Sequence, residues 1–447
     1  MSDLLELGDR IVAAAQGDEQ VEAVVLHSQD TEVRVYEGEV ESFSSAESRG
    51  VGIRVVKNGR QGFAYAGTFD EDALFETLAE ARDNAEFGTQ DEWAGLAEPD
   101  GVDVADLELF DARLVGFPTE KKIELAIELE KATVGADSRI TGVESAEYVD
   151  AMADGAIVTT TGIRTSGRET GCYVAAYALA EDEGETQTGF GFSVARQPGE
   201  LDPAKAASDS AERATRLLGA TKPASERLTV VFDPFVTAQF ISIITDTLSA
   251  EAVLKGRSLF AERIGEEVAS PSITLVDDPL NVEAFTATET DGEGLAARRN
   301  VMIRGGVLEQ FLHNAYTARA MGTVSTGSAV RGGFKSTPTT GAHAAALAPG
   351  ELAPEEIYRK VGEGLLIQGV AGIHSGVNPV SGDFSTGAEG LRITGGEPAG
   401  PVREFTIAST IQKMLKEVVA VGSDLEWLPM DAAGLTLAIA DVTVSGS

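Results

Sequence analysis

In the N-terminal part of the chain, apolar residues recur first at helical spacing and then at strand spacing. Residues 4–15 have the periodicity of an amphipathic helix. Short apolar or alternating runs that predict strands follow at 21–26, 31–36, 39–45 and 51–56. Asn58-Gly59 is a strong signal for a two-residue hairpin turn. Residues 61–66 should therefore return as a strand, and a helix over 70–87 follows.

A similar order of elements occurs a second time. The pattern predicts a helix over residues 119–134 and another over 202–218, which Asp202-Pro203 caps. The strands expected between these helices lie near Tyr148, Ile157, Cys172 and Phe190. Strands followed by a helix thus occur twice before residue 219. This favours a duplicated α+β unit, although two such segments can also resemble each other by chance.

Residues 219–226, rich in small and polar residues with one proline, form the best candidate linker. Beyond it, glycine density rises and short strands dominate, with helices expected at 233–249 and 354–361. A hairpin is expected around Arg304-Gly305-Gly306. Because the strands come in hairpins and not between regular crossover helices, the pattern predicts an α+β fold.

The length of 447 residues favours two domains. We expect an N-terminal α+β domain over residues 1–220 and a β-rich C-terminal domain over 226–447. The chain contains no apolar run long enough to span a membrane, and its first residues lack the pattern of a signal peptide. Its lone cysteine, Cys172, cannot form an intramolecular disulfide, which fits a reducing cytoplasm.

The formal net charge is −37, from 35 Lys and Arg against 72 Asp and Glu. This balance disfavours nucleic acid as a partner, because contacts to phosphate need basic patches. An acidic surface of this kind is compatible with a high-salt cytoplasm or simply with a GC-rich genome. The charge therefore excludes one class of partner without identifying another.

The helix expected at 233–249 is the most informative segment for chemistry. Asp233 is a good N-cap and Pro234 suits the first helical position. Its apolar stripe consists of Val236, Phe240, Ile243, Ile244 and Leu248. Ser242, Asp246 and Ser249 line another face. One carboxylate and two hydroxyls cannot hold a catalytic zinc, which needs about three His, Cys or carboxylate ligands.

Other candidate residues are scattered. None of the four histidines has a His partner at helical metal-binding spacing, and no phosphate-binding glycine loop occurs. His374 lies close in sequence to three polar residues, Ser381, Asp383 and Ser385. These four residues could line a peptide cavity, and His374, Asp383 and Ser385 could form a peptidase site. An ordinary surface loop is the simpler interpretation.

Several ordered segments resemble the TldD/TldE family, whose TldE branch is also called PmbA and once carried the label of a DNA gyrase modulator. The resemblance spans essentially the whole chain and depends on the order and spacing of its segments. They include Glu47-Ser-Arg-Gly-Val-Gly-Ile-Arg-Val55, Lys255-Gly-Arg-Ser-Leu-Phe260, Thr290-Asp-Gly-Glu-Gly294, Ser381-Gly-Asp-Phe-Ser-Thr-Gly387 and Val421-Gly-Ser-Asp424.

The resemblance implies a cytoplasmic peptidase of two domains, in which TldD-type subunits bind zinc through an HExxxH helix. Here that motif falls on Ile241, Ser242 and Asp246. An isoleucine cannot ligate a metal, and a serine cannot replace the glutamate that activates a metal-bound water. A further cysteine ligand expected near the C-terminus is absent from residues 422–427. These departures match the TldE branch, which implies a non-catalytic chain without a cofactor.

The implied partner is a TldD-type subunit that carries the zinc, in a hetero-oligomer that degrades unfolded or modified peptides; alone, the chain could be a homodimer. Peptide capture as an added strand would suit such an assembly, because main-chain hydrogen bonds need no particular sequence. Two alternatives stay open. One is a homodimer that binds peptides without cleaving them, and the other is a peptidase that uses the residues around His374.

Overall fold

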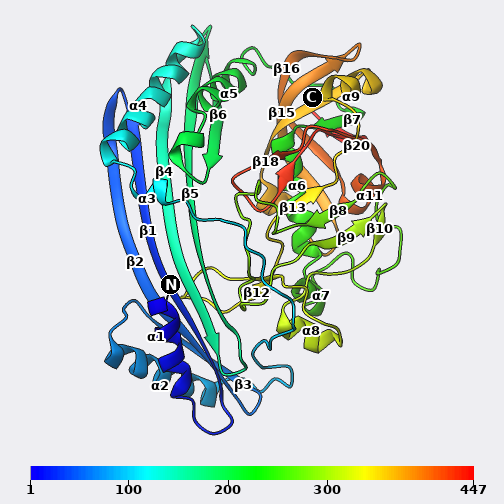
Figure 1. Cartoon of the computed structure of the whole chain (residues 1–447). Coiled ribbons are helices and arrows are strands. Elements are labelled where there is room, and N and C mark those ends of the chain that lie inside the picture. Colours follow the sequence, from blue (N-terminus) through cyan, green and yellow to red (C-terminus); the bar gives the residue numbers. More distant parts are fainter. Residues whose placement is uncertain (1, 447) are drawn as a thin grey trace.

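Six long antiparallel strands in the order β3-β2-β1-β4-β5-β6 form the first half of the molecule (Figure 1). The computed structural model describes residues 2–446, without the side chains of Ser2 and His374. The strands are β1 (Gln20–Tyr36), β2 (Glu39–Lys57), β3 (Arg60–Ala66), β4 (Ile140–Thr159), β5 (Arg164–Asp182) and β6 (Glu185–Ala195). The helices of this half are α1 (Ser2–Ala13), α2 (Glu71–Phe87), α3 (Ala112–Val115), α4 (Thr119–Ala136) and α5 (Pro203–Thr215).

Helices cover one face of this sheet in two groups. Helices α1 and α2 pack on one end of the strands, where Val21, Val25 and Ile53 are buried. Helices α4 and α5 pack on the other end, against Val33 and Tyr148. Because side chains alternate along a strand, the intervening residues of β1 point to the opposite face, toward the second half of the chain.

The duplicated unit is confirmed. A helix, a three-stranded meander and a second helix occur as α1-β1-β2-β3-α2 and again as α4-β4-β5-β6-α5. The two meanders join through their first strands, β1 and β4, which pair antiparallel with Val25 opposite Ala156. The hairpin turn at Asn58-Gly59 is also confirmed, with φ of 53° and 70° in the left-handed region that such turns require.

The predicted breaks within the first two strands were wrong. Residues 21–26 and 31–36 belong to one strand, β1, and residues 39–45 and 51–56 to another, β2. The middle of β1 is polar because it lies between the two groups of helices. There Lys122 donates to the Thr31 hydroxyl over 3.0 Å, and a polar gap of this kind looks like a turn in the sequence.

The second half contains a closed ring of five strands. β7 (Glu226–Phe232) runs parallel to β14 (Gly364–Ala371) and antiparallel to β20 (Leu437–Ser445). β15 (Asp383–Thr394) and β16 (Glu397–Thr410) continue from β14, and β16 closes the ring on β20 with Ile407 opposite Val444. Helix α6 (Pro234–Thr247) packs against this barrel, where the Phe240 ring contacts those of Phe232 and Phe384.

Shorter elements fill the rest of this half and confirm the α+β class. The helix predicted at 354–361 is α9 (Pro354–Val361), and the hairpin at Gly305-Gly306 joins β9 (Asn300–Arg304) to β10 (Val307–Leu308). The others are η1 (Pro198–Glu200, in the first half), α7 (Ala250–Leu254), β8 (Leu275–Asp277), α8 (Ala315–Met321), β11 (Ala329–Val330), β12 (Thr339–Thr340), β13 (Ala345–Leu347), α10 (Ile373–Gly376), α11 (Ile411–Lys416), β17 (Val418–Val421), β18 (Glu426–Trp427) and β19 (Ala433–Gly434). The division into domains at residues 220–226 stays a prediction.

Over residues 2–446, none of the helices combines the length and apolarity needed to cross a lipid bilayer.

The two halves approach each other closely where Phe334 meets β2. A Cβ atom on Gly52 would lie 2.2 Å from the Phe334 carbonyl oxygen, and one on Gly50 would lie 2.4 Å from the Phe334 ring. Real Cβ atoms do not tolerate such distances, so both positions need glycine for the halves to dock. Glycine within a strand often marks a close approach of another backbone.

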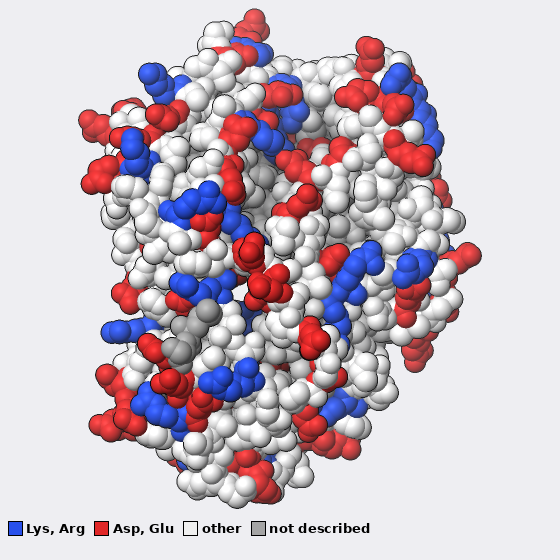
Figure 2. All heavy atoms as spheres, viewed as in Figure 1, with Lys and Arg blue, Asp and Glu red and all other residues white. Residues whose placement is uncertain are grey.

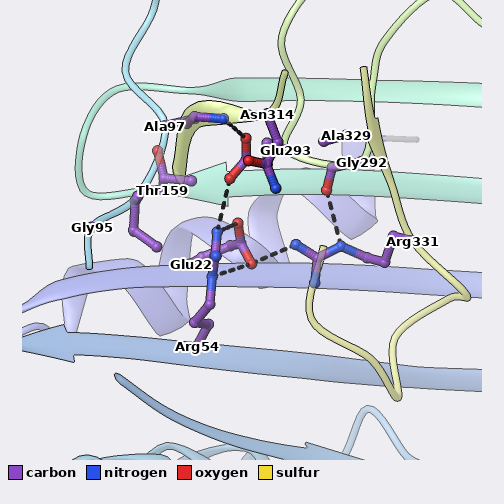
Figure 3. A network of polar contacts seen from close by, with 12 residues as sticks. Glu22, Arg54, Gly95, Ala97, Thr159, Gly292, Glu293, Asn314, Ala329 and Arg331 are labelled. Atoms are coloured by element: carbon purple, nitrogen blue, oxygen red, sulfur yellow. Dashed lines mark hydrogen bonds and ion pairs between the residues drawn. The ribbon is translucent and has the colours of Figure 1, made fainter. Parts of the chain in front are cut away.

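Four charged side chains form a buried network at this junction (Figure 3). The Arg54 guanidinium donates to both oxygens of Glu22, over 3.1 and 2.7 Å, and Arg331 donates to Glu22 over 2.7 Å. Glu293 lies 3.7 Å from the same Arg54. The side chains of all four residues are at most 5% exposed. Glu22 and Arg54 come from the sheet, whereas Glu293 and Arg331 come from the second half.

The network contains carboxyl groups with different proton affinities. Burial alone would raise the pKa of Glu22, but the charges of Arg331 and Arg54 outweigh it and hold that pKa below its ordinary value. Burial raises the pKa of Glu293 in spite of Arg54. Burial and the nearby Glu293 raise the pKa of Asp291 to about 7, although three backbone N–H groups donate to its carboxyl group.

Replacing Arg54 with Gln should destabilise the protein strongly. The substitution leaves Glu22 and Glu293 buried with less compensation, and breaking a buried ion pair from one side costs about 3–5 kcal/mol. The matched control is Arg164→Gln, which removes an ion pair to Asp9 whose side chains are 50% and 43% exposed. That change should lower the free energy of unfolding by less than about 1 kcal/mol. Urea unfolding of both variants measures the difference, and equal losses would contradict a structural role for the network.

Asp291 should make stability depend on pH between about 4 and 7. Its pKa is raised in the folded state to about 7, against about 3.9 in an unfolded chain. The contribution of Asp291 to the free energy of unfolding is therefore complete below its pKa in the unfolded chain, and it is lost as pH rises through 7. Unfolding free energies of the wild type and Asp291→Asn should diverge between about pH 4 and 7, by up to about 1.4 kcal/mol per pH unit. Parallel pH profiles would show that Asp291 does not titrate there.

Candidate functional site

Helix α6 begins as its sequence predicts. The Asp233 carboxylate accepts a hydrogen bond from the Val236 N–H over 2.9 Å, and Pro234 occupies the first turn. Burial raises the pKa of Asp233 to about 6. Val236, Phe240, Ile244 and Leu248 of the predicted apolar stripe are all buried, at 2% exposure or less. The helix is enclosed on more than this one face, however, because Thr237, Ala238, Ile241 and Thr245 are buried as well.

The three positions that the resemblance aligns with HExxxH lie in different surroundings. Ile241 is fully buried in the hydrophobic core of the second half. Ser242 is half-buried and its hydroxyl donates to the Asp431 carboxylate over 2.8 Å. Asp246 is exposed, and its pKa is raised by partial desolvation and by the negative charge of Asp431.

This donor set does not fit a zinc ion. An aliphatic side chain, a hydroxyl that is already hydrogen-bonded and one carboxylate replace the two histidines and the glutamate. Apart from the side chains left out of the description, no three His, Cys, Asp or Glu residues are grouped so that they could hold a metal. In the segment where a cysteine ligand is expected, Asp424 instead accepts hydrogen bonds from Thr436, at 3.0 Å from its N–H and 2.7 Å from its hydroxyl.

The other predicted residues lie at the surface near the start of β15. Ser381, Asp383 and Ser385 are exposed, and the Ser381 hydroxyl donates to Asp383 over 2.7 Å. The side chain of His374 lies outside the described part of the chain. The structure thus brings Ser381 and Asp383 into contact. The role of all four residues as the lining of a peptide cavity stays a prediction.

Sequence reasoning missed an internal hollow between the sheet and the second half. Two neighbouring cavities of about 220 and 510 Å³, which share several lining residues, lie there. Strands β4 and β5 supply Ala153 and Glu169 to both cavities, while Thr288, Thr290 and Arg331 come from the second half. Arg331 thus belongs both to the wall of the hollow and to the buried charge network.

An outer groove of about 920 Å³ adjoins this hollow. It lies between β5 and residues 106–113, which comprise the end of the long connection from α2 to α3 and the first residues of α3. Figure 2 shows a hollow between the two halves with Asp and Glu side chains gathered around it. Ser166, Gly167 and Arg168 line both the groove and the smaller cavity.

The amino-acid sequences of β4 and β5 contain glycines that could have indicated these cavities. Gly155, Gly167 and Gly171 lie inside β4 and β5, where glycine weakens a sheet unless something approaches closely. A Cβ atom on Gly171 would lie 2.8 Å from the Phe285 ring, whereas Gly167 has open space beside it. The sequence alone does not show which segment or ligand approaches a strand glycine.

Comparisons with known proteins place the whole chain in one family. Models of the PmbA/TldA metallopeptidase match in order: domain 1 over residues 21–85, the central domain over 114–218 and the C-terminal domain over 225–446. Metalloprotease PmbA of Escherichia coli O157:H7 is 27% identical over 392 residues, which cover 87% of this chain and 84% of the relative. A metalloprotease of Methanothermobacter thermautotrophicus is 28% identical over 408 residues, or 89% and 86% of the two chains.

Solved structures share the fold over its full length. A Thermotoga maritima protein that bears the gyrase-modulator label superposes with a TM-score of 0.89 at 26% identity, over 98% of this chain and 99% of that one. TldE of Thermococcus kodakarensis gives a TM-score of 0.90 over 100% of both chains, and at 23% identity this likeness concerns the fold alone. The three matched family models and these relatives show that the chain belongs to the PmbA/TldD metallopeptidase family.

Proposed function

We propose that this chain is the non-catalytic, TldE/PmbA-type subunit of a cytoplasmic zinc metalloprotease that degrades unfolded or modified peptides. The zinc and the catalytic glutamate belong to a TldD-type partner subunit. The observation that carries the proposal is Ile241, which occupies a metal-ligand position of the family motif and is fully buried in the core. A buried aliphatic side chain supplies neither a metal ligand nor an acid or base.

The surroundings of Ile241 support the proposal further. A water activated by zinc needs the metal and a nearby general base. Ser242 stands at the position of that base, and its hydroxyl is bound to Asp431. The two carboxylates that remain nearby, Asp246 and Asp431, repel each other electrostatically. A hydrolytic site at α6 would therefore need residues that this chain does not have.

A non-catalytic subunit still needs a stable scaffold and a place for peptides. The core around α6 stabilises the second half, and the buried charges at the junction hold the two halves together. The hollow and groove between the halves provide space that a peptide could enter. A hetero-oligomer with the TldD-type subunit is the assembly that this division of roles requires.

The test is reconstitution with a TldD-type subunit from the same genome. The chain alone should contain no stoichiometric zinc by elemental analysis and should not cleave an unfolded test peptide. The mixture should form a complex and cleave the peptide, and a chelator should abolish the cleavage. One zinc per chain in the purified protein, or hydrolysis without the partner, would overturn the proposal.

Substitutions at α6 separate a scaffold from a catalyst. Ser242→Ala and Asp246→Ala should leave the kcat of the reconstituted complex within about twofold of the wild type. Loss of a general base typically lowers a rate by about 10²–10⁴-fold. The matched change in the partner, its HExxxH glutamate to glutamine, should show that loss. A comparable loss from either α6 variant would assign catalysis to this chain.

Two alternatives make different predictions for the isolated chain. A peptidase that uses His374, Asp383 and Ser385 should cleave peptides without the partner, and His374→Ala should abolish that cleavage. A homodimer that only holds peptides should keep its size in gel filtration when the TldD-type subunit is added. Formation of a mixed complex supports the subunit assignment over both.

A further inference from the structure

Strand β2 has a long edge that no other strand covers. Strand β3 pairs with β2 only from Val51 to Lys57, so residues 39–49 have a neighbouring strand only on the β1 side. Every one of these residues is exposed. Among residues 2–446, no backbone group outside β1 hydrogen-bonds to this stretch. Figure 1 shows it on the outer side of the sheet, away from the second half of the chain.

This edge lacks most of the features that keep exposed strands apart. Proteins block long edges with proline, lysine, bulges or a covering segment, because unpaired N–H and C=O groups invite another chain. Residues 39–49 contain no proline and no lysine, and their pairing with β1 is irregular only at its beginning, before Ser42. Val40 and Phe43 are 41% and 47% exposed, although Val35 and Val33 opposite them are fully buried. The edge is therefore suited to association.

The turn at Asn58-Gly59 shows which backbone groups of β2 are unpaired. In a two-residue hairpin the flanking residues, here Lys57 and Arg60, form a hydrogen-bonded pair, so the backbone groups of Lys57 point toward β3. The direction alternates along a strand, and the register with β1 is unbroken over residues 42–56. The N–H and C=O groups of alternate residues from Phe43 to Arg49 therefore point outward.

The charges along the edge favour an antiparallel partner of the same sequence. One end carries Glu39 and Glu41, and the other end carries Arg49. Glu41 is paired with Arg34 but remains 49% exposed, and Arg49 forms no ion pair with any described residue. Two copies in parallel would place like charges together. In an antiparallel pair, each Arg49 meets the acidic end of the other copy, and opposite charges across two strands are stabilising.

An antiparallel pair centred on Ser45 matches these charges best. It places Arg49 of each copy opposite Glu41 of the other, and it sets the outward-pointing backbone groups against each other. Moving the centre to residue 44 would oppose Glu41 to Glu47, two like charges. Moving it to residue 46 would oppose Glu41 to Val51, where β3 already covers the edge. Ser45 therefore marks the position of a two-fold axis.

We propose that two copies of this chain associate through the free edge of β2, antiparallel and centred on Ser45, to form one continuous sheet. Such an interface is isologous, because both copies contribute the same residues. Main-chain hydrogen bonds and the two Glu41–Arg49 pairs hold it, and the apolar groups of Val40 and Phe43 lose contact with water on association. The hollow, the barrel and α6 take no part, so the inference is independent of the proposed function.

Sedimentation velocity of the full chain alone measures the association as a function of protein concentration. The wild type should pass from monomer to dimer, and Ser45→Pro should raise the dissociation constant at least tenfold because it removes a central outward N–H. The matched control is Ser45→Ala, which keeps that N–H and should dimerise like the wild type. Proline is tolerated at an edge whose N–H faces solvent, and circular dichroism checks the fold.

Two results would overturn the proposal. One is a wild type that stays monomeric up to its solubility limit. The other is an equal dissociation constant for the proline and alanine variants when both are folded, because the central N–H would then take no part in the association.

A symmetric disulfide tests the register. The two copies of residue 45 should face each other in a hydrogen-bonded pair with Cα atoms about 5.5 Å apart, a distance that a disulfide can span. Ser45→Cys should therefore cross-link rapidly under mild oxidation. Ser48→Cys, on the same exposed edge, lies opposite Ser42 and should cross-link at least tenfold more slowly. The native Cys172 is 1% exposed and does not compete. Equal cross-linking rates would rule out this register.

Exchanging the charges tests the ion pairs. Arg49→Glu and Glu41→Arg should each weaken the dimer about fivefold to tenfold through like-charge repulsion at two symmetric positions, and added salt should reduce the loss. The double variant should recover the affinity, because its charges are only exchanged. A double variant no tighter than the single ones would show that these side chains do not face each other.

Binding of the TldD-type subunit and zinc-dependent hydrolysis are measured separately, and Ser45→Pro should leave both unchanged. A monomeric wild type that still forms an active complex would reject this inference and leave the proposed function standing. A dimer through β2 that forms no complex with the TldD-type subunit would have the opposite meaning.

Discussion

The buried pairing of Glu22 with Arg54 and Arg331 is the constraint on which the arrangement of the molecule depends. Two guanidinium groups, one from each half of the chain, converge on a single carboxylate that is 1% exposed. Ions so deeply buried are stable only while every partner is in place. The position of the sheet against the barrel half is therefore fixed at this point. The shape of the hollow and of the groove between the halves therefore depends on this buried pairing.

The same constraint gives a physical reason for two segments that carry the family resemblance. In the segment from Glu47 to Val55, Gly50 and Gly52 make room for Phe334 and Arg54 supplies the buried charge. In Thr290-Asp-Gly-Glu-Gly294, Glu293 faces Arg54, and Asp291 folds the loop by accepting three backbone N–H groups. These residues dock the two halves, which explains their presence in a chain without the zinc motif.

The sequence was sufficient for features that depend on local periodicity. The repeated unit, the Asn58-Gly59 turn and helix α6 with its Asp233 cap all follow from short-range patterns. It was insufficient where a residue's surroundings come from distant segments. The polar middle of β1 looked like a turn because the two helix groups that flank it lie far along the chain. The burial of Ile241 and the hollow around Glu169 likewise depend on how the halves meet.

The central claim is that this chain supports catalysis by a partner without taking part in the chemistry. Native mass spectrometry of the reconstituted complex, followed by gas-phase dissociation into subunits, tests it most directly. We expect one zinc per pair of subunits, retained by the TldD-type subunit, with this chain released free of metal. Zinc that stays with this chain after dissociation would show that this chain itself holds the catalytic metal.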